Sequence, residues 1–172
     1  MTYKQIFIIV FVIVAAFYVF KVKGFNPFVS KIKSNIVLYT LDGKTTPLDE
    51  CVGENGTFIF IMGTWCPYCS KEVEQLKTLN DFFKSHKINI LIGMKGQTYE
   101  EIQSWVLRHD FPWNWKAFYW YKDYEKDFHI KIKGVPYLAI RNKKGKTTFK
   151  KAGVFQSDHL SKLALNLLKN DK

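Results

Sequence analysis

Two cysteines, Cys66 and Cys69, stand three positions apart in the stretch GTWCPYCSKE, directly after an apolar run. Thiols at this spacing can bind a metal, close a loop or exchange electrons as a dithiol–disulfide couple. The chain has 3 cysteines in all, too few for a fold that is held together by a disulfide framework. The third, Cys51, falls near a predicted turn, where we expect a buried and inert thiol.

The place of the pair in the chain favours redox chemistry. Residues 57–62 predict a buried strand, and Pro67 suits the first turn of a helix that follows it. Cys66 then lies at a helix N-terminus, where unpaired N–H groups and the helix dipole stabilise a thiolate. Because the thiolate is the attacking species in disulfide exchange, Cys66 is the predicted nucleophile. Cys69, one turn further and more shielded, is predicted to resolve the mixed disulfide.

Metal binding is the alternative use of these thiols. A structural zinc site needs four ligands, and the sequence has no second C-x-x-C motif. The histidines are isolated, and we expect each at the surface or at a helix end: His86, His109, His129 and His159. We therefore predict no metal and no cofactor. A Cu(I)-binding module, for which the two thiolates suffice, stays open as the alternative function.

The predicted elements alternate before the chain ends in a hairpin and a helix. Strands are expected at 57–62, 88–94 and 116–121, helices at 72–84 and 98–109, and a short helical turn at 123–130. A first hairpin is expected at 35–48, a last hairpin at 137–150, and a closing helix capped by Ser157 at 157–169. This order predicts an α/β domain with a central mixed sheet and helices on both faces, in which the last hairpin adds an antiparallel edge.

Two segments carry a family resemblance. FIFIMGTWCPYCSKEVEQL (58–76) and KIKGVPYLAIRNKKG (131–145) resemble the two halves of the active site in the thioredoxin superfamily. The resemblance implies a thioredoxin-like three-layer sandwich, with Pro136 in cis after Val135 and facing the dithiol. A proline has no N–H group, so the backbone of Val135 is expected to be free to pair with an extended substrate.

Other residues around the motif are assigned to substrate binding. They are Trp65, Pro67, Tyr68 and Val135, and Trp65 is expected to pack beside Cys66 and shield it. The aromatic segment 111–121 is expected to fill strand and core positions, with a partner-binding surface as the alternative.

Within the superfamily, residues 35–170 most resemble the membrane-anchored TlpA/ResA-like thiol–disulfide oxidoreductases, including the ScsD-like branch. In this group a glutamate three residues past the second cysteine lies near the dithiol, and Glu72 matches it. The resemblance implies that Glu72 accepts the proton of Cys69; an ordinary acid in the first helical turn is the alternative. Phe60 stands where thioredoxin has a buried acid, which leaves Glu72 or solvent as the proton acceptor.

The N-terminus predicts a membrane anchor. Residues 6–20 are uncharged and apolar, with lysines on both sides. We expect a signal anchor at 1–23, a linker at 24–34 and a thioredoxin-like domain at 35–172; a cleaved signal peptide is the alternative. The resemblance implies a single-pass protein of the bacterial inner membrane with its domain on the periplasmic side. The lysines at 21–33 favour the opposite orientation, but large domains often translocate despite such charges.

The predicted function is disulfide exchange with extracytoplasmic protein thiols, and a membrane redox partner is expected to recycle the dithiol. The net charge of +11 comes mostly from lysines spread along the chain, without a nucleic-acid docking motif, so no nucleic-acid partner is predicted. The resemblance implies a reductant, for example in cytochrome c maturation, or an oxidant or copper-stress role. The sequence leaves the redox direction open, because the reduction potential depends on groups around the thiolate.

Overall fold

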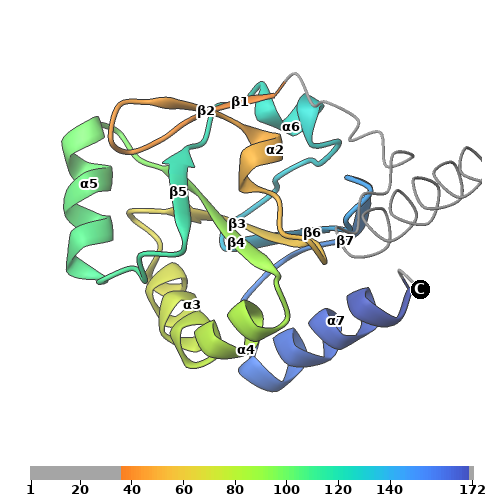
Figure 1. Ribbon diagram of the computed structural model, residues 1–172. Coiled ribbons are helices and arrows are strands. Elements are labelled where there is room, and N and C mark those ends of the chain that lie inside the picture. Colours follow the sequence, from red (N-terminus) through yellow and green to blue (C-terminus); the bar gives the residue numbers. More distant parts are fainter. Residues whose placement is uncertain (1–35, 171–172) are drawn as a thin grey trace, which may run out of the picture. The chain divides into compact units, whose positions relative to one another are not determined.

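A computed structural model of the chain describes residues 36–170, which fold around a five-stranded sheet of order β5-β4-β3-β6-β7 (Figure 1). The strands are β3 (Thr57–Gly63), β4 (Asn89–Lys95), β5 (Lys116–Tyr119), β6 (Tyr137–Arg141) and β7 (Thr147–Ala152). β3 pairs in parallel with β4, which pairs in parallel with β5, whereas β6 is antiparallel to both β3 and β7. The mixed sheet is confirmed.

The last hairpin, β6 and β7, adds an antiparallel edge to the sheet, as predicted. β7 is the edge strand, and β6 lies between β3 and β7. The burial of the two strands gives the reason: residues 137–140 are all buried, whereas β7 alternates and then exposes its lysines. A strand with apolar residues on both faces belongs in the interior of a sheet.

Helices cover both faces of the sheet, as predicted. α3 (Pro67–Thr78), α4 (Asn80–Ser85), α5 (Tyr99–Arg108) and α7 (Ser157–Asn170) share one apolar core with Phe58, Phe60 and Met62 of β3. The alternate residues Ile59 and Ile61 face a second core. There the cover consists of the hairpin β1 (Val37–Tyr39) and β2 (Thr45–Pro47) with the short helices α2 (Leu48–Cys51) and α6 (Tyr124–Asp127). In Figure 1, α3 and α7 lie on the opposite side of the sheet from α2 and α6.

The helix predicted at 72–84 is interrupted. Leu79, with φ −104° and ψ 3°, ends α3, and α4 begins at Asn80. The Asn80 Oδ1 accepts hydrogen bonds from Trp115 Nε1 (2.9 Å) and Asn114 Nδ2 (3.0 Å). These bonds hold Asn80 against the turn before β5, and helical spacing alone did not reveal them. The closing helix is confirmed, because α7 spans Ser157–Asn170.

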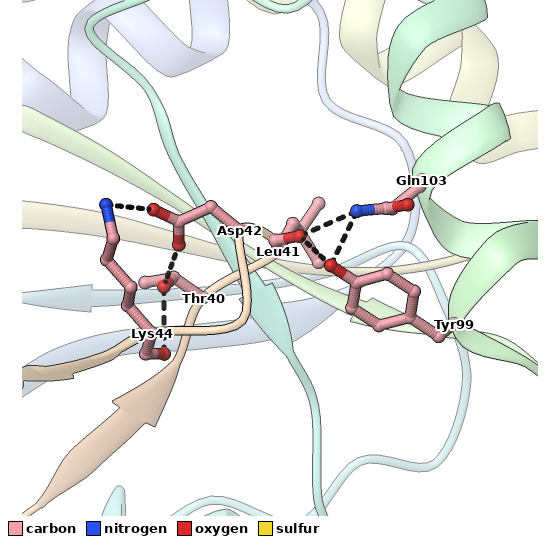
Figure 2. Close-up of polar contacts among 6 residues, drawn as sticks. All are labelled: Thr40, Leu41, Asp42, Lys44, Tyr99 and Gln103. Atoms are coloured by element: carbon pink, nitrogen blue, oxygen red, sulfur yellow. Dashed lines mark hydrogen bonds and ion pairs between the residues drawn. The ribbon is translucent and has the colours of Figure 1, made fainter.

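The N-terminal hairpin is tied to α5 through one carbonyl group. Figure 2 shows the Leu41 carbonyl accepting hydrogen bonds from the Tyr99 hydroxyl and from Gln103 Nε2, the latter at 2.9 Å. Within the hairpin turn, Lys44 lies 3.1 Å from the Asp42 carboxylate, which also accepts from the Thr40 hydroxyl. The hairpin therefore holds the first two turns of α5, whose N-cap Thr98 accepts from Glu101 N.

The aromatic segment 111–121 divides between the core and the surface. Trp115, Phe118 and Trp120 are buried, as expected for core positions, whereas Trp113 and Tyr121 are exposed. The signal anchor at 1–23 and the linker at 24–34 lie outside the described residues. Within residues 36–170, no helix has both the length and the apolar character that a membrane crossing requires.

Candidate functional site

Cys66 lies where β3 turns into α3. Its N–H donates to Gly63 O (3.1 Å), Cys66 is the N-cap of α3, and Pro67 occupies the first turn of the helix. The Cys66 Sγ accepts a hydrogen bond from Cys69 N at 3.2 Å. The helix N-terminus thus directs a backbone donor at the sulfur, the arrangement that stabilises a thiolate. The predicted location of Cys66 is confirmed.

Cys69 is the more deeply placed thiol of the pair. Its side chain has no exposed surface, whereas 6% of Cys66 is exposed. Burial raises the pKa of the Cys69 thiol, and the neighbouring Cys66 side chain raises it further. Both cysteines are free thiols, as is Cys51, which is buried in α2 as predicted. A substrate can therefore reach Cys66 but not Cys69.

The loop before β6 faces the Cys66 sulfur. The Val135–Pro136 peptide bond is cis, which confirms the expectation for Pro136. The Cys66 thiol lies 3.5 Å from the Val135 carbonyl oxygen, to which it donates. Pairing of the Val135 backbone with an extended substrate stays a prediction. The pairing of β3 with β6, in register at Ile61 and Tyr137, brings these two loops together.

Glu72 is a buried acid in α3, one turn after Cys69. Its side chain has no exposed surface, its Oε2 accepts from Phe155 N at 2.9 Å, and its Oε1 has no hydrogen-bond partner among the described residues. Burial raises the pKa of Glu72 to about 7, and the single backbone hydrogen bond offsets this only in part. The charge of Glu72 also contributes to the raised pKa of Cys69. Glu72 is therefore not an ordinary surface acid of a first turn.

The aromatic side chains of the motif are exposed. Trp65 is 60% exposed and Tyr68 58%, whereas Cys66 is only 6% exposed, so shielding of Cys66 by Trp65 stays a prediction. At this turn, a Cβ atom on Gly63 would lie 3.0 Å from the Trp65 ring, so the ring lies across the bare glycine backbone. Beside it, a groove of about 470 Å³ runs between residues 65–68 and residues 132–135.

Sequence reasoning missed three contributors to this site. Lys95 and Lys133 line the groove, and the backbone of Phe155 holds Glu72. Lys95 could have been found, because it ends the parallel strand β4, and ligands bind outside the carboxyl ends of the strands in open α/β folds. Nothing in the sequence pointed to Phe155, since it follows β7, far from the motif.

The histidines lie away from the sulfur atoms except for one indirect contact. His86 and His109 are the C-caps of α4 and α5, as predicted for helix ends. His109 Nε2 lies 2.9 Å from the hydroxyl of Ser70, the residue after Cys69, while its Nδ1 lies 2.8 Å from Trp105 O. This histidine thus links α5 to the first turn of α3.

The chain is similar to known proteins. Residues 27–163 match the Redoxin family model. The thiol-disulfide oxidoreductase ResA of Bacillus cereus is 29% identical over 86 residues, which are 49% of this chain and 49% of ResA. The match thus spans about half the length of this curated relative.

Solved structures extend the likeness to the whole domain. StoA from Bacillus subtilis superposes with a TM-score of 0.61 at 18% identity, over 77% of this chain and 97% of StoA. A thioredoxin family thiol:disulfide interchange protein from Chlorobium tepidum gives 0.67 at 14% identity, over 77% and 92%. These similarities confirm the thioredoxin-like fold. With most of its length matched by the family model, the chain belongs to the Redoxin family.

Proposed function

We propose that this protein is a thiol–disulfide oxidoreductase whose redox couple is formed by Cys66 and Cys69. The observation that carries the proposal is the unequal placement of two free thiols in one helical turn. Cys66 reaches the surface beside the Val135 carbonyl, while Cys69 is enclosed behind it. A couple that forms a mixed disulfide at one sulfur and resolves it at the other needs this asymmetry.

In the reducing direction, the Cys66 thiolate attacks one sulfur of a substrate disulfide. A mixed disulfide forms, the substrate S–S bond breaks, and the released substrate thiolate takes up a proton. Cys69, once deprotonated, attacks the Cys66 sulfur and releases the second substrate thiolate. Two electrons have then passed to the substrate, and the chain holds a Cys66–Cys69 disulfide. The same steps in reverse oxidise a dithiol substrate.

Glu72 is the proposed proton acceptor for Cys69. The thiol needs a base because its pKa is raised by burial, and solvent does not reach it. A carboxylate with a pKa of about 7 is poised to accept and return a proton near neutral pH. Its Oε1 has no other hydrogen-bond partner among residues 36–170, so this oxygen is available for the transfer.

The proposal extends to the location of the protein and to the direction in which it transfers electrons. We also propose a single-pass anchor in the bacterial inner membrane, with the domain on the periplasmic side; the uncharged apolar run at residues 6–20 supports the anchor. We propose a reductant of extracytoplasmic protein thiols there, including those of cytochrome c maturation, recycled by a membrane redox partner. An alkaline phosphatase reporter at the C-terminus tests the orientation, because activity requires export. A reduction potential well below that of glutathione is expected of a reductant.

The exchange reaction is tested by trapping. Cys69→Ala is expected to accumulate a mixed disulfide with a disulfide substrate, because the second step is removed. Cys66→Ala should trap nothing, and Cys51→Ala should turn over like the wild type, since that thiol lies in the other core. Absence of a trapped species with Cys69→Ala, while insulin or another disulfide protein is present in excess, would count against the proposal.

A Cu(I)-binding module using the same thiolates is the second candidate. Its support is the short Cys66–Cys69 spacing, which places two soft ligands in one turn. Titration of the reduced chain with Cu(I), run beside an insulin-reduction assay, separates the two functions. Tight binding without turnover favours the copper module.

A further inference from the structure

Two grooves adjoin at Trp65 and Lys95, and one of them is lined by the reactive cysteine. The first, described above, runs between residues 65–68 and 132–135. The second, of about 460 Å³, lies between residues 94–99 and the aromatic residues 119–121. Trp65 and Lys95 line both grooves. The two hollows are therefore neighbouring parts of one surface, and Cys66 opens onto it.

The charge of this surface is one-sided. Its lining includes Lys95 and Lys133 but no aspartate or glutamate in either groove. Lys71 adds a third positive charge, because its Nζ lies 5.7 Å from the centre of the Tyr68 ring. None of these three lysines forms an ion pair with the described part of the chain, whereas Lys44, Lys77, Lys87 and Lys162 each pair with an acid.

The nearest helix shapes the second groove. Glu101, in the first turn of α5, accepts from the Thr64 hydroxyl and from Gln97 N at 2.8 Å. Its carboxylate thereby fixes the loop that forms one wall of the second groove.

The same surface exposes aromatic rings. Trp65, Tyr68 and Tyr121 are each about half exposed or more, at 60%, 58% and 49%. Exposed tryptophan and tyrosine side chains are typical of protein-binding surfaces, where they contribute large contact areas. Rings interleaved with unpaired lysines fit an extended polypeptide that carries negative charge.

We infer that the two grooves form one binding track for an extended segment of a substrate protein with acidic side chains within a few residues of its target disulfide. This inference rests on the proposed exchange activity and adds a substrate class to it. The aromatic rings hold the segment across Cys66, and Lys71, Lys95 and Lys133 attract its carboxylates. Complementary charge of this kind raises the rate of encounter and selects among partners.

The test compares two peptides that contain the same disulfide, flanked by glutamates in one and by lysines in the other. The rate for each peptide is divided by the rate of the same protein with dithiodipyridine, an uncharged disulfide, so that changes in thiol reactivity cancel. Lys95→Glu/Lys133→Glu reverses two charges of the track. Lys144→Glu/Lys146→Glu, in the turn between β6 and β7, makes the same change of net charge at the other end of β6 from Pro136.

The wild type is expected to prefer the acidic peptide by about tenfold at low salt, with the preference falling as salt is added. Lys95→Glu/Lys133→Glu should abolish or invert this preference, and Lys144→Glu/Lys146→Glu should keep it. Equal rates for both peptides, or equal effects of the two double variants, would overturn the inference alone. No reaction with any disulfide would overturn the proposed function with it.

A membrane surface is the other bearer of negative charge that these lysines could meet. Vesicles of phosphatidylglycerol are therefore added as a further arm. If the track binds them through Lys95 and Lys133 while the wild type treats both peptides alike, the surface is a lipid contact and the inference is wrong.

Discussion

The carboxylate of Glu72 accepts a hydrogen bond from the backbone N–H of Phe155, 83 positions further along the chain. This bond joins the helix that carries the dithiol to the loop between β7 and α7. A second bond of the same kind joins Gln75 Oε1 to Ser157 N at 3.3 Å. Two turns of α3 thus hold the start of α7, and the acid proposed for proton transfer is also a tertiary contact.

In the reduced state, Glu72→Gln should be more stable than the wild type, and the difference in free energy of unfolding should grow as the pH rises. The pKa of Glu72 is raised from 4.5 to about 7 in the folded state, so between these values the folded chain binds more protons than the unfolded chain. Stability is therefore lost as the pH rises through this window, and the penalty is absent below it. From pH 5 to pH 8, we expect the difference in free energy of unfolding between the variant and the wild type to increase by about 2 to 3 kcal/mol.

Urea unfolding of both proteins at the two pH values measures this gain. Glu74→Gln is the matched control, because that acid lies on the same helix but is exposed. A difference between Glu72→Gln and the wild type that does not change with pH would show that the buried carboxylate is not the titrating group.

The same substitution should slow the step that Cys69 performs. In a preformed mixed disulfide at Cys66, release of the substrate requires Cys69 to lose its proton. With the wild type, we expect the release rate to rise with pH around an inflection near 7, because only ionised Glu72 accepts a proton. Glu72→Gln should lose this inflection and be slower by at least about tenfold at pH 7.5. Stopped-flow measurement of substrate release checks the inflection and the rate. If Glu72→Gln keeps the inflection, solvent and not Glu72 accepts the proton of Cys69.

Gly93→Ala should destabilise the domain by about 2 kcal/mol, as overpacking of a core does. A Cβ atom at this position in β4 would lie 2.6 Å from Trp120 Cε3 and 3.2 Å from Phe118 Cζ, and both rings are buried. Gly134→Ala is the control, because nothing lies within 4 Å of its added atom. Urea midpoints of the two variants compare them, and similar midpoints would mean that the rings move aside.

Asn80→Ala should cost about 1 to 3 kcal/mol, because it removes the acceptor of the buried Trp115 indole N–H. The change should also alter the near-ultraviolet signal of Trp115, whose ring would lose its fixed orientation. Asn166→Ala, at an exposed position of α7, serves as the control. Equal stability of the two variants would contradict the role given to Asn80 in breaking the helix.

Local patterns in the sequence predicted the elements and the chemistry of the motif. The buried run at 57–62 and Pro67 at the start of a helix are each contained in a few neighbouring residues, and each was confirmed. What escaped prediction depends on distant partners. The break at Leu79 is accompanied by hydrogen bonds from the distant Trp115 and Asn114 to Asn80.

The same distinction holds at the site. The exposure of Trp65 depends on the missing side chain of Gly63, and the burial of Glu72 depends on α7 and the loop before it. No spacing rule within the motif contains that information. The lysines of the track were counted in the net charge, but their convergence required the turns after β4 and before β6 to be placed side by side.

The pairing of two strands also determines how the redox site can be disrupted. Cys66 and the Val135 carbonyl extend from β3 and β6, which pair continuously from Thr57–Arg141 to Ile61–Tyr137 at the centre of the sheet. Neither Cys66 nor Val135 belongs to a peripheral unit that could unfold by itself while the rest of the domain stays folded. Assembly of the redox centre and cooperative folding of the whole domain are thus a single event, and amides at Phe60 and Leu138 should exchange with solvent only through global unfolding.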